Sequence, residues 1–149
     1  MLKLDPQLLG QHSPPKKCEV ERGALRKFAQ ALGLKDPIYY SLEAAQSQGY
    51  RDVVAPPTFA VTLLPWEVPG LELPLAGVLH GEQEFHWENP LCAKDIIYVS
   101  GWVDEVKSRA NPAGKMTMIT VSSEGRQSGG ELAFTARALL VVTEEDAHA

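Results

Sequence analysis

The chain of 149 residues has little cysteine, no strong basic charge and no long apolar run. Its two cysteines, Cys18 and Cys92, form neither a disulfide framework nor a metal-binding spacing, so we expect a reducing, cytoplasmic compartment. The net charge of −5 argues against a protein that follows a phosphate backbone, and we expect no nucleic-acid partner. No stretch approaches the length of a membrane span, and residues 1–10 lack the apolar run of a signal peptide.

What the chain does have is enough length and apolar content for a sizeable core. Hydrophobic residues make up 44% of it and charged residues 22%, which is the balance of a globular protein rather than a disordered one. It contains no internal repeat and no linker-like segment. We therefore expect residues 1–149 to form a single domain.

The first half of the chain has the apolar spacing of helices. Leu25, Phe28 and Leu32 fall on one face of a predicted helix. A second, short helix is predicted over residues 41–48, with Ser41 as its N-cap. A third, apolar helix is predicted to begin at Pro57 and to stop before Pro65, because proline fits the first turn of a helix but not its interior.

The second half is predicted to form an antiparallel meander, and residues 18–21 also fit a short strand. Four strands are expected, over residues 80–88, 96–106, 116–123 and 132–143. Alternation in the first of them places one set of polar side chains on a shared face: His80, Glu82, Glu84, His86 and Glu88. Helices followed by strands predict an α+β domain with helices packed on one face of a curved antiparallel sheet.

Two segments carry a family resemblance. Residues 53–60 read Val-Val-Ala-Pro-Pro-Thr-Phe-Ala, and residues 78–85, about twenty positions later, read Val-Leu-His-Gly-Glu-Gln-Glu-Phe. In this order they resemble the MaoC-like dehydratases, of the type whose domain forms the N-terminal half of larger hydratases. The resemblance covers residues 16–143 and implies the hot-dog fold, in which an antiparallel sheet wraps around a central helix.

The catalytic signature of these relatives is altered here. R-specific hydratases of this superfamily carry Gly-Asp-x-Asn-Pro-x-His, whose Asp and His act as the acid/base pair, whereas residues 33–39 read Gly-Leu-Lys-Asp-Pro-Ile-Tyr. Leu34 cannot move a proton, and Tyr39 is a poor base at neutral pH. The family also uses a backbone N–H of an Ala-His-Gly segment as an oxyanion donor. The matching residues 55–57 end in Pro57, which has no N–H.

The resemblance therefore implies one component of a dehydratase or hydratase that acts on 3-hydroxyacyl thioesters of coenzyme A or acyl carrier protein. We expect the acyl-binding, non-catalytic subunit, in a homodimer or in a heterodimer with a second hot-dog chain. Two alternatives stay open: an acyl-CoA-binding module without turnover, and a hot-dog thioesterase. The absence of any carboxylate from Val53 to Trp66 counts against the thioesterase. No cofactor is expected.

Site residues follow from the same resemblance. His80 and Glu82 are the catalytic candidates, and the predicted substrate-binding residues are Tyr39, Tyr40, Pro57, Thr58, Phe59, Ala60, His80, Gly81 and Gln83. The alternative interpretation makes His80 and Glu82 an ordinary polar strand face or a hydrogen-bonded pair at a dimer edge, and the aromatic residues core or interface. No metal site is expected, because side chains in a line along one strand cannot surround an ion tetrahedrally.

Overall fold

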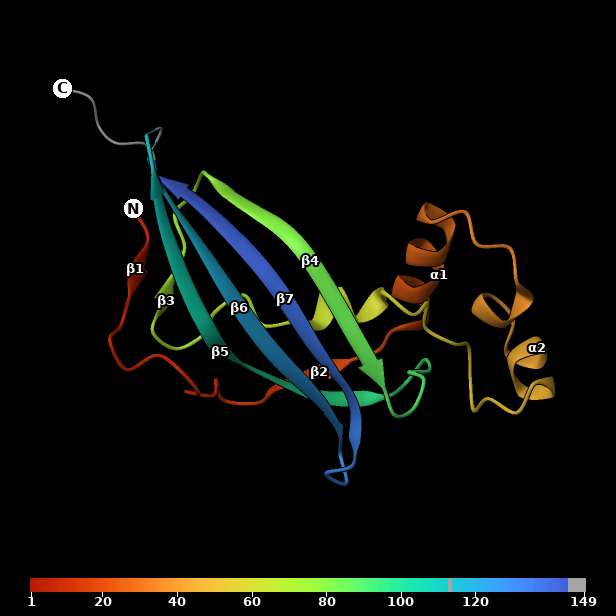
Figure 1. The fold of residues 1–149 in the computed structure, drawn as a ribbon. Helices are drawn as coiled ribbons and strands as arrows, with labels where there is room; N and C mark the ends of the chain where they lie inside the picture. The colour runs from red at the N-terminus through yellow and green to blue at the C-terminus, as the bar shows by residue number, and fades with distance from the viewer. Residues whose placement is uncertain (113, 145–149) are drawn as a thin grey trace.

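The computed structural model describes residues 1–112 and 114–144, which are built around a curved five-stranded antiparallel sheet (Figure 1). The strand order is β2-β5-β6-β7-β4, and a separate two-stranded sheet pairs β1 with β3. The strands of the large sheet are β2 (Lys16–Glu19), β4 (Val78–Trp87), β5 (Ile96–Asn111), β6 (Gly114–Gln127) and β7 (Leu132–Glu144). The four predicted strands are confirmed, and β5 and β6 both run further than predicted. The predicted four-strand meander is wrong, because β5, β6 and β7 are consecutive neighbours but β4 pairs with β7 instead of β5. The described residues contain no helix of the length and apolarity that a bilayer crossing requires.

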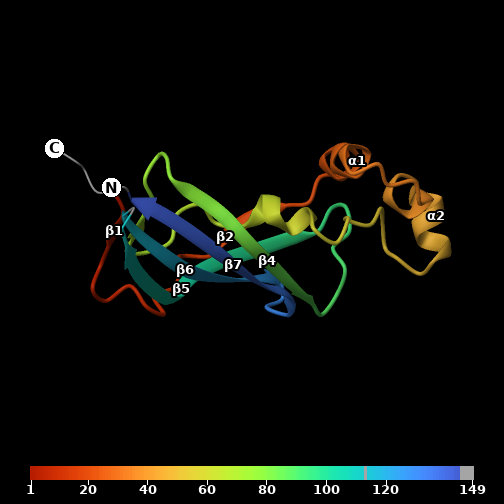
Figure 2. The same cartoon turned by 45° about the horizontal axis from the view of Figure 1, so that its top comes forward.

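The two predicted N-terminal helices are confirmed as α1 (Arg22–Ala31) and α2 (Leu42–Ser47). Ser41 caps α2 as expected, because its hydroxyl accepts a hydrogen bond from the Ala44 amide at 3.2 Å. Both helices lie beyond one end of the sheet (Figures 1 and 2), so the prediction that they cover its face is wrong. The reason is that α1 packs only its short apolar face against the end of the core, where Phe28 meets Phe59 edge-on at 5.5 Å.

The segment that crosses the inner face of the sheet is a short 3-10 helix, η2 (Phe59–Leu63), which begins two residues after the predicted start and stops before Pro65 as predicted. Pro65 forces Leu64 into an extended conformation, with φ −64° and ψ 144°, and so ends the helix early. The segment lies close to β5, since a Cβ added at Gly101 would approach the Pro65 ring to 2.7 Å. A short helix therefore crosses the sheet at this place.

Three apolar clusters hold the described elements together, and the smallest joins Ala45 of α2 to Val54 and Cys92. The first joins α1 and η2 to the sheet around Phe134, which is fully buried and touches the rings of Phe85 and Trp87. The second lies at the opposite end of the sheet, where Leu8 packs with Val68 and with strand residues. Residues 2–14, the N-terminal segment, reach this cluster through β1 (Lys3–Leu4), which pairs with β3 (Leu71–Glu72).

The packing of Phe134 against Gly125 on β6 generates a stability prediction. A Cβ at Gly125 would lie 2.2 Å from the Phe134 ring, so Gly125→Ala forces this ring out of its site and is expected to cost about 1–3 kcal/mol of unfolding free energy. Urea unfolding measures the loss. Gly129→Ala is the matched control, because its Cβ meets nothing within 4 Å. Equal stability of the two variants would contradict this packing.

Candidate functional site

The edge strand β4 contains a β-bulge at Gly81 that changes which side chains face inward. His80 pairs with Leu140 and Glu82 pairs with Leu139, so Gly81 is an extra residue in the strand. The prediction that His80 and Glu82 share a face is therefore wrong, because the bulge interrupts the alternation. His80 and Gln83 instead lie together on the inner side, with His80 Nε2 3.0 Å from Gln83 Oε1.

An apolar cavity of about 260 Å³, called the slot below, lies between the inner face of the sheet and residues 61–73. Val61 and Leu64 line it from η2 and its end, and Ala136 and Ala138 line it from β7. The slot exists because these two alanines are small and because η2 ends before it can fill the space. Its polar lining comes from three side chains: His80, Gln83 and the buried Ser123.

Exposed apolar side chains occur at the slot and, separately, along the segment that forms the edge of the sheet. Trp66 lines the slot and yet is 91% exposed. Leu75 and Leu79, just before and within β4, are also exposed. Single exposed leucines are common on protein surfaces, so the feature here that favours pairing with another chain is the open edge of β4.

A second hollow, of about 290 Å³, shares no lining residue with the slot and is called the Tyr39 hollow below. Tyr39 and Pro57 line it together with Trp87. Glu88 is the one carboxylate among the described residues that line it, and its Oε1 lies 3.3 Å from Nε2 of His86 at the surface. The hollow thus has no inward-facing acid/base pair.

The segment that aligns with the catalytic signature uses its polar groups to hold its own conformation. Asp36 caps the 3-10 helix η1 (Pro37–Tyr39), accepting a hydrogen bond from the Ile38 amide at 3.1 Å. The Tyr40 hydroxyl donates to the carbonyl oxygen of Leu34. These groups are therefore engaged locally and do not project into either cavity.

The other predicted binding residues occupy mixed positions. Thr58 is exposed, whereas Phe59 and Ala60 are 4% and 0% exposed within the first apolar cluster and line neither cavity. Among the predicted residues, Tyr39 and Pro57 thus line the Tyr39 hollow, whereas His80 and Gln83 line the slot. The sequence prediction omitted Val61, Leu64, Ala136 and Ala138. The signal that could have identified the slot is the pair Ala136 and Ala138, two small residues on the inward face of one strand.

The extended chain that leads into η2 is held in place by the buried carboxylate of Asp52. Asp52 accepts two hydrogen bonds from Arg22 of α1, at 2.9 and 3.0 Å, and a third from the Val53 amide at 2.7 Å. Burial alone would raise the pKa of Asp52, but the Val53 N–H and the Arg22 charge outweigh it, so the pKa is lowered. A lowered carboxyl pKa stabilises the fold at neutral pH, and that contribution is lost as the pH falls through the lowered value. Ala55 is then held by a 2.8 Å bond to the Leu91 carbonyl.

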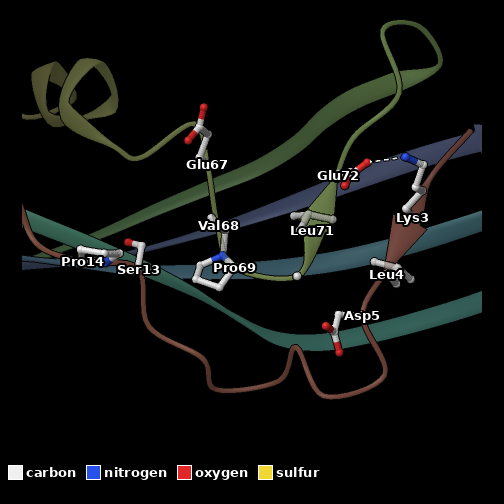
Figure 3. Close-up of a pocket in the computed structure, with 11 residues that line it drawn as sticks. Lys3, Leu4, Asp5, Ser13, Pro14, Glu67, Val68, Pro69, Leu71 and Glu72 are labelled. Atoms are coloured by element: carbon white, nitrogen blue, oxygen red, sulfur yellow. Dashed lines mark hydrogen bonds and ion pairs between the residues drawn. The ribbon is translucent and has the colours of Figure 1, made fainter.

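A third, larger hollow of about 590 Å³ lies outside the slot, between the N-terminal segment and residues 67–72 (Figure 3). Four of its eleven lining residues are charged, Lys3, Asp5, Glu67 and Glu72, and the side chains of Lys3 and Glu72 pair at 2.7 Å. Its open, charged lining does not suit an acyl chain. Within the described ranges, no three His, Cys, Asp or Glu side chains are grouped in a way that would hold a metal ion.

Comparison with known proteins assigns the family. The profile of the FAS1-like dehydratase domain region matches residues 7–136. A UPF0336 protein of Saccharopolyspora erythraea is 38% identical, over 97% of this chain and 96% of its own length. A UPF0336 protein of Streptomyces avermitilis is 35% identical, over 94% and 95%. The chain therefore belongs to the FAS1-like dehydratase domain family.

Solved structures with low sequence identity share the fold. The MaoC-like dehydratase from Rhodospirillum rubrum superposes with a TM-score of 0.71 at 22% identity, over 97% of this chain and 98% of the other. A chain of the HadBC 3R-hydroxyacyl-ACP dehydratase complex from Mycobacterium tuberculosis gives a TM-score of 0.70 at 22% identity, over 95% and 94%. The (R)-hydratase from A. caviae gives 0.68 at 15% identity, over 91% and 98%. The predicted hot-dog fold and the resemblance to MaoC-like dehydratases are both confirmed.

Proposed function

We propose that this chain is the acyl-binding, non-catalytic subunit of an enzyme that dehydrates 3-hydroxyacyl thioesters or hydrates the corresponding enoyl thioesters. The observation that supports this most is the coexistence of a formed apolar slot with a signature segment that lacks its chemical groups. In this proposal residues 1–149 act as one hot-dog domain in the cytoplasm. The thioester is carried by coenzyme A or by acyl carrier protein.

The chemistry of the reaction requires an acid, a base and a donor for the thioester oxygen. At the aligned positions Leu34 supplies no proton, Tyr39 lies in a hollow that has no inward-facing acid/base pair, and Pro57 supplies no N–H. Asp36 is occupied as a helix cap. A second hot-dog chain with the intact Gly-Asp-x-Asn-Pro-x-His signature would supply these groups.

The partner chain would pair with β4. In the described sheet β4 is an edge strand with no neighbour on its outer side, and Leu79 on it is 62% exposed. An open edge with exposed apolar side chains favours pairing with another sheet. His80 and Gln83 lie on this strand and also line the slot, so an acyl chain would lie beside the junction of the two subunits.

The alternative without a catalytic partner is an acyl-thioester-binding homodimer. The observation that favours it is that this chain already carries an apolar slot of about 260 Å³, and holding an acyl chain there requires no acid/base pair. A thioesterase is less well supported, because no carboxylate stands among the described residues that line the slot. Activity in the presence of a signature-bearing partner separates the first two possibilities.

We predict that the purified chain alone does not hydrate crotonyl-CoA or longer enoyl-CoA esters, because Leu34, Tyr39 and Pro57 occupy the three chemical positions. Mixed with a hot-dog chain that carries the intact signature, it should raise that chain's turnover of long enoyl esters. A spectrophotometric assay of the enoyl double bond measures both. Robust turnover by the lone chain would contradict the proposal, and its loss in His80→Ala would move the chemistry to His80.

We further predict that Ala138→Phe fills the slot and weakens acyl-CoA binding about tenfold or more, which corresponds to about 1.4 kcal/mol. Ala138 lines the slot, whereas its neighbour Leu139 faces the outer side of the same strand. Leu139→Phe is therefore the matched control and should bind like the parent. Titration calorimetry measures both, and equal affinity of the two variants, with retained circular dichroism, would place the acyl chain elsewhere.

A further inference from the structure

The slot ends at a tight turn formed by residues 68–71, Val-Pro-Gly-Leu. The Leu71 amide donates to the Val68 carbonyl at 3.1 Å, and Gly70 has a φ of +77°. Proline at the second position and a left-handed glycine at the third are the residues of a type II turn. The turn is thus specified by its own sequence and places Val68 and Leu71 at a defined point against the sheet.

Val68 and Leu71 separate two spaces of opposite character. Both line the slot on one side and the open, charged hollow of Figure 3 on the other. Along β7 the slot runs from Ala136 to Leu140, a length on the order of 13 Å at about 3.3 Å per residue. The next inward residue, Val142, is fully buried in the second apolar cluster with Val68. An acyl chain extended along the strand in this direction would therefore stop at the turn.

The N-terminal segment holds the turn in place from outside. Leu4 pairs with Leu71, and the Asp5 amide donates to the Gly70 carbonyl at 2.9 Å. Leu8 is 5% exposed and packs closely against the turn, since a Cβ added at Gly70 would lie 2.6 Å from the Cβ of Leu8.

The same segment is fastened to the sheet at two further points. The Ser13 amide donates to the Gly101 carbonyl at 2.8 Å, and the Leu2 amide donates to the Glu144 carboxylate at 2.8 Å. The turn consequently cannot swing outward unless the contacts of residues 2–14 with the sheet are broken.

From these contacts we propose that the Val68–Leu71 turn, supported by the N-terminal segment, sets the longest acyl chain that the slot accepts. The inference rests on the proposed acyl-binding function and specifies its substrate class as chains that end within the slot. A longer chain would have to displace Val68 or Leu71 and enter the charged hollow, where burial of its terminal carbons is lost.

The experiment compares binding of saturated acyl-CoA esters from butyryl to palmitoyl, by titration calorimetry below the concentrations at which they form micelles. The double variant Val68→Ala/Leu71→Ala joins the slot to the outer hollow. It should bind esters longer than the parent's optimum at least fivefold more tightly, with short esters unchanged within twofold. Val68→Phe should shift the optimum toward shorter chains.

Two further variants test the support and the specificity of the effect. Leu8 lines neither space but supports the turn from outside. Leu8→Ala should therefore loosen the turn and shift the optimal chain length in the same direction as the double variant. Glu67 lines only the outer hollow, so Glu67→Ala should keep the parent's dependence of affinity on chain length. Circular dichroism and the thermal midpoint verify that each variant is folded.

The outcomes distinguish the two proposals. If the parent binds no acyl-CoA of any length, with or without a signature-bearing partner, the proposed function fails and this inference fails with it. If the parent binds esters with a length optimum that neither the folded double variant nor folded Val68→Phe changes, the turn is not the limit, while the acyl-binding function stands. If Leu8→Ala alone keeps the parent's profile, the supporting role of the N-terminal segment is overturned.

Discussion

The arrangement of the site depends on one packing constraint, which is the small volume that the chain occupies between Pro57 and Pro65. Proline at both ends limits the central segment to the five residues of η2, and Pro65 then passes against Gly101 of β5. The curved sheet has room for a longer helix than this. Because Ala136 and Ala138 contribute so little volume from β7, the unfilled space becomes the slot rather than core.

A second constraint orients the polar groups toward that space. The bulge at Gly81 turns His80 inward beside Gln83, while Glu82 faces outward. An inward glutamate would have brought an unpaired carboxylate next to apolar side chains, which is costly. The bulge therefore leaves the slot without a carboxylate on its β4 side, as a site for an apolar chain requires.

The sequence predicted the strands well because their alternation is regular and long, as in β7, where one face carries Phe134, Ala136 and Ala138. It could not predict the bulge, since one extra residue leaves no periodic signal and yet reverses which side chains face inward. The placement of α1 and α2 beyond the end of the sheet was also missed, because an amphipathic pattern identifies an apolar face but not the surface it contacts.

The division of the site was likewise beyond sequence reasoning. Family resemblance selected residues from two cavities that share no lining residue, and it also selected Phe59 and Ala60, which are buried in the core and line neither cavity. The altered signature, in contrast, was fully visible in the sequence, because it depends on residue identity at Leu34, Tyr39 and Pro57. The loss of catalytic groups can be recognised from residue types, whereas the location of a cavity depends on how the side chains pack.

The most direct test of the account is to locate a bound acyl chain. An acyl-CoA that carries a diazirine at the end of its chain can be photolysed with the protein and its signature-bearing partner, and the labelled peptides mapped by mass spectrometry. Labelling of this chain within residues 61–73 and 136–140 is predicted. Labelling concentrated in residues 38–57 or 87–91, around the Tyr39 hollow, would contradict the account.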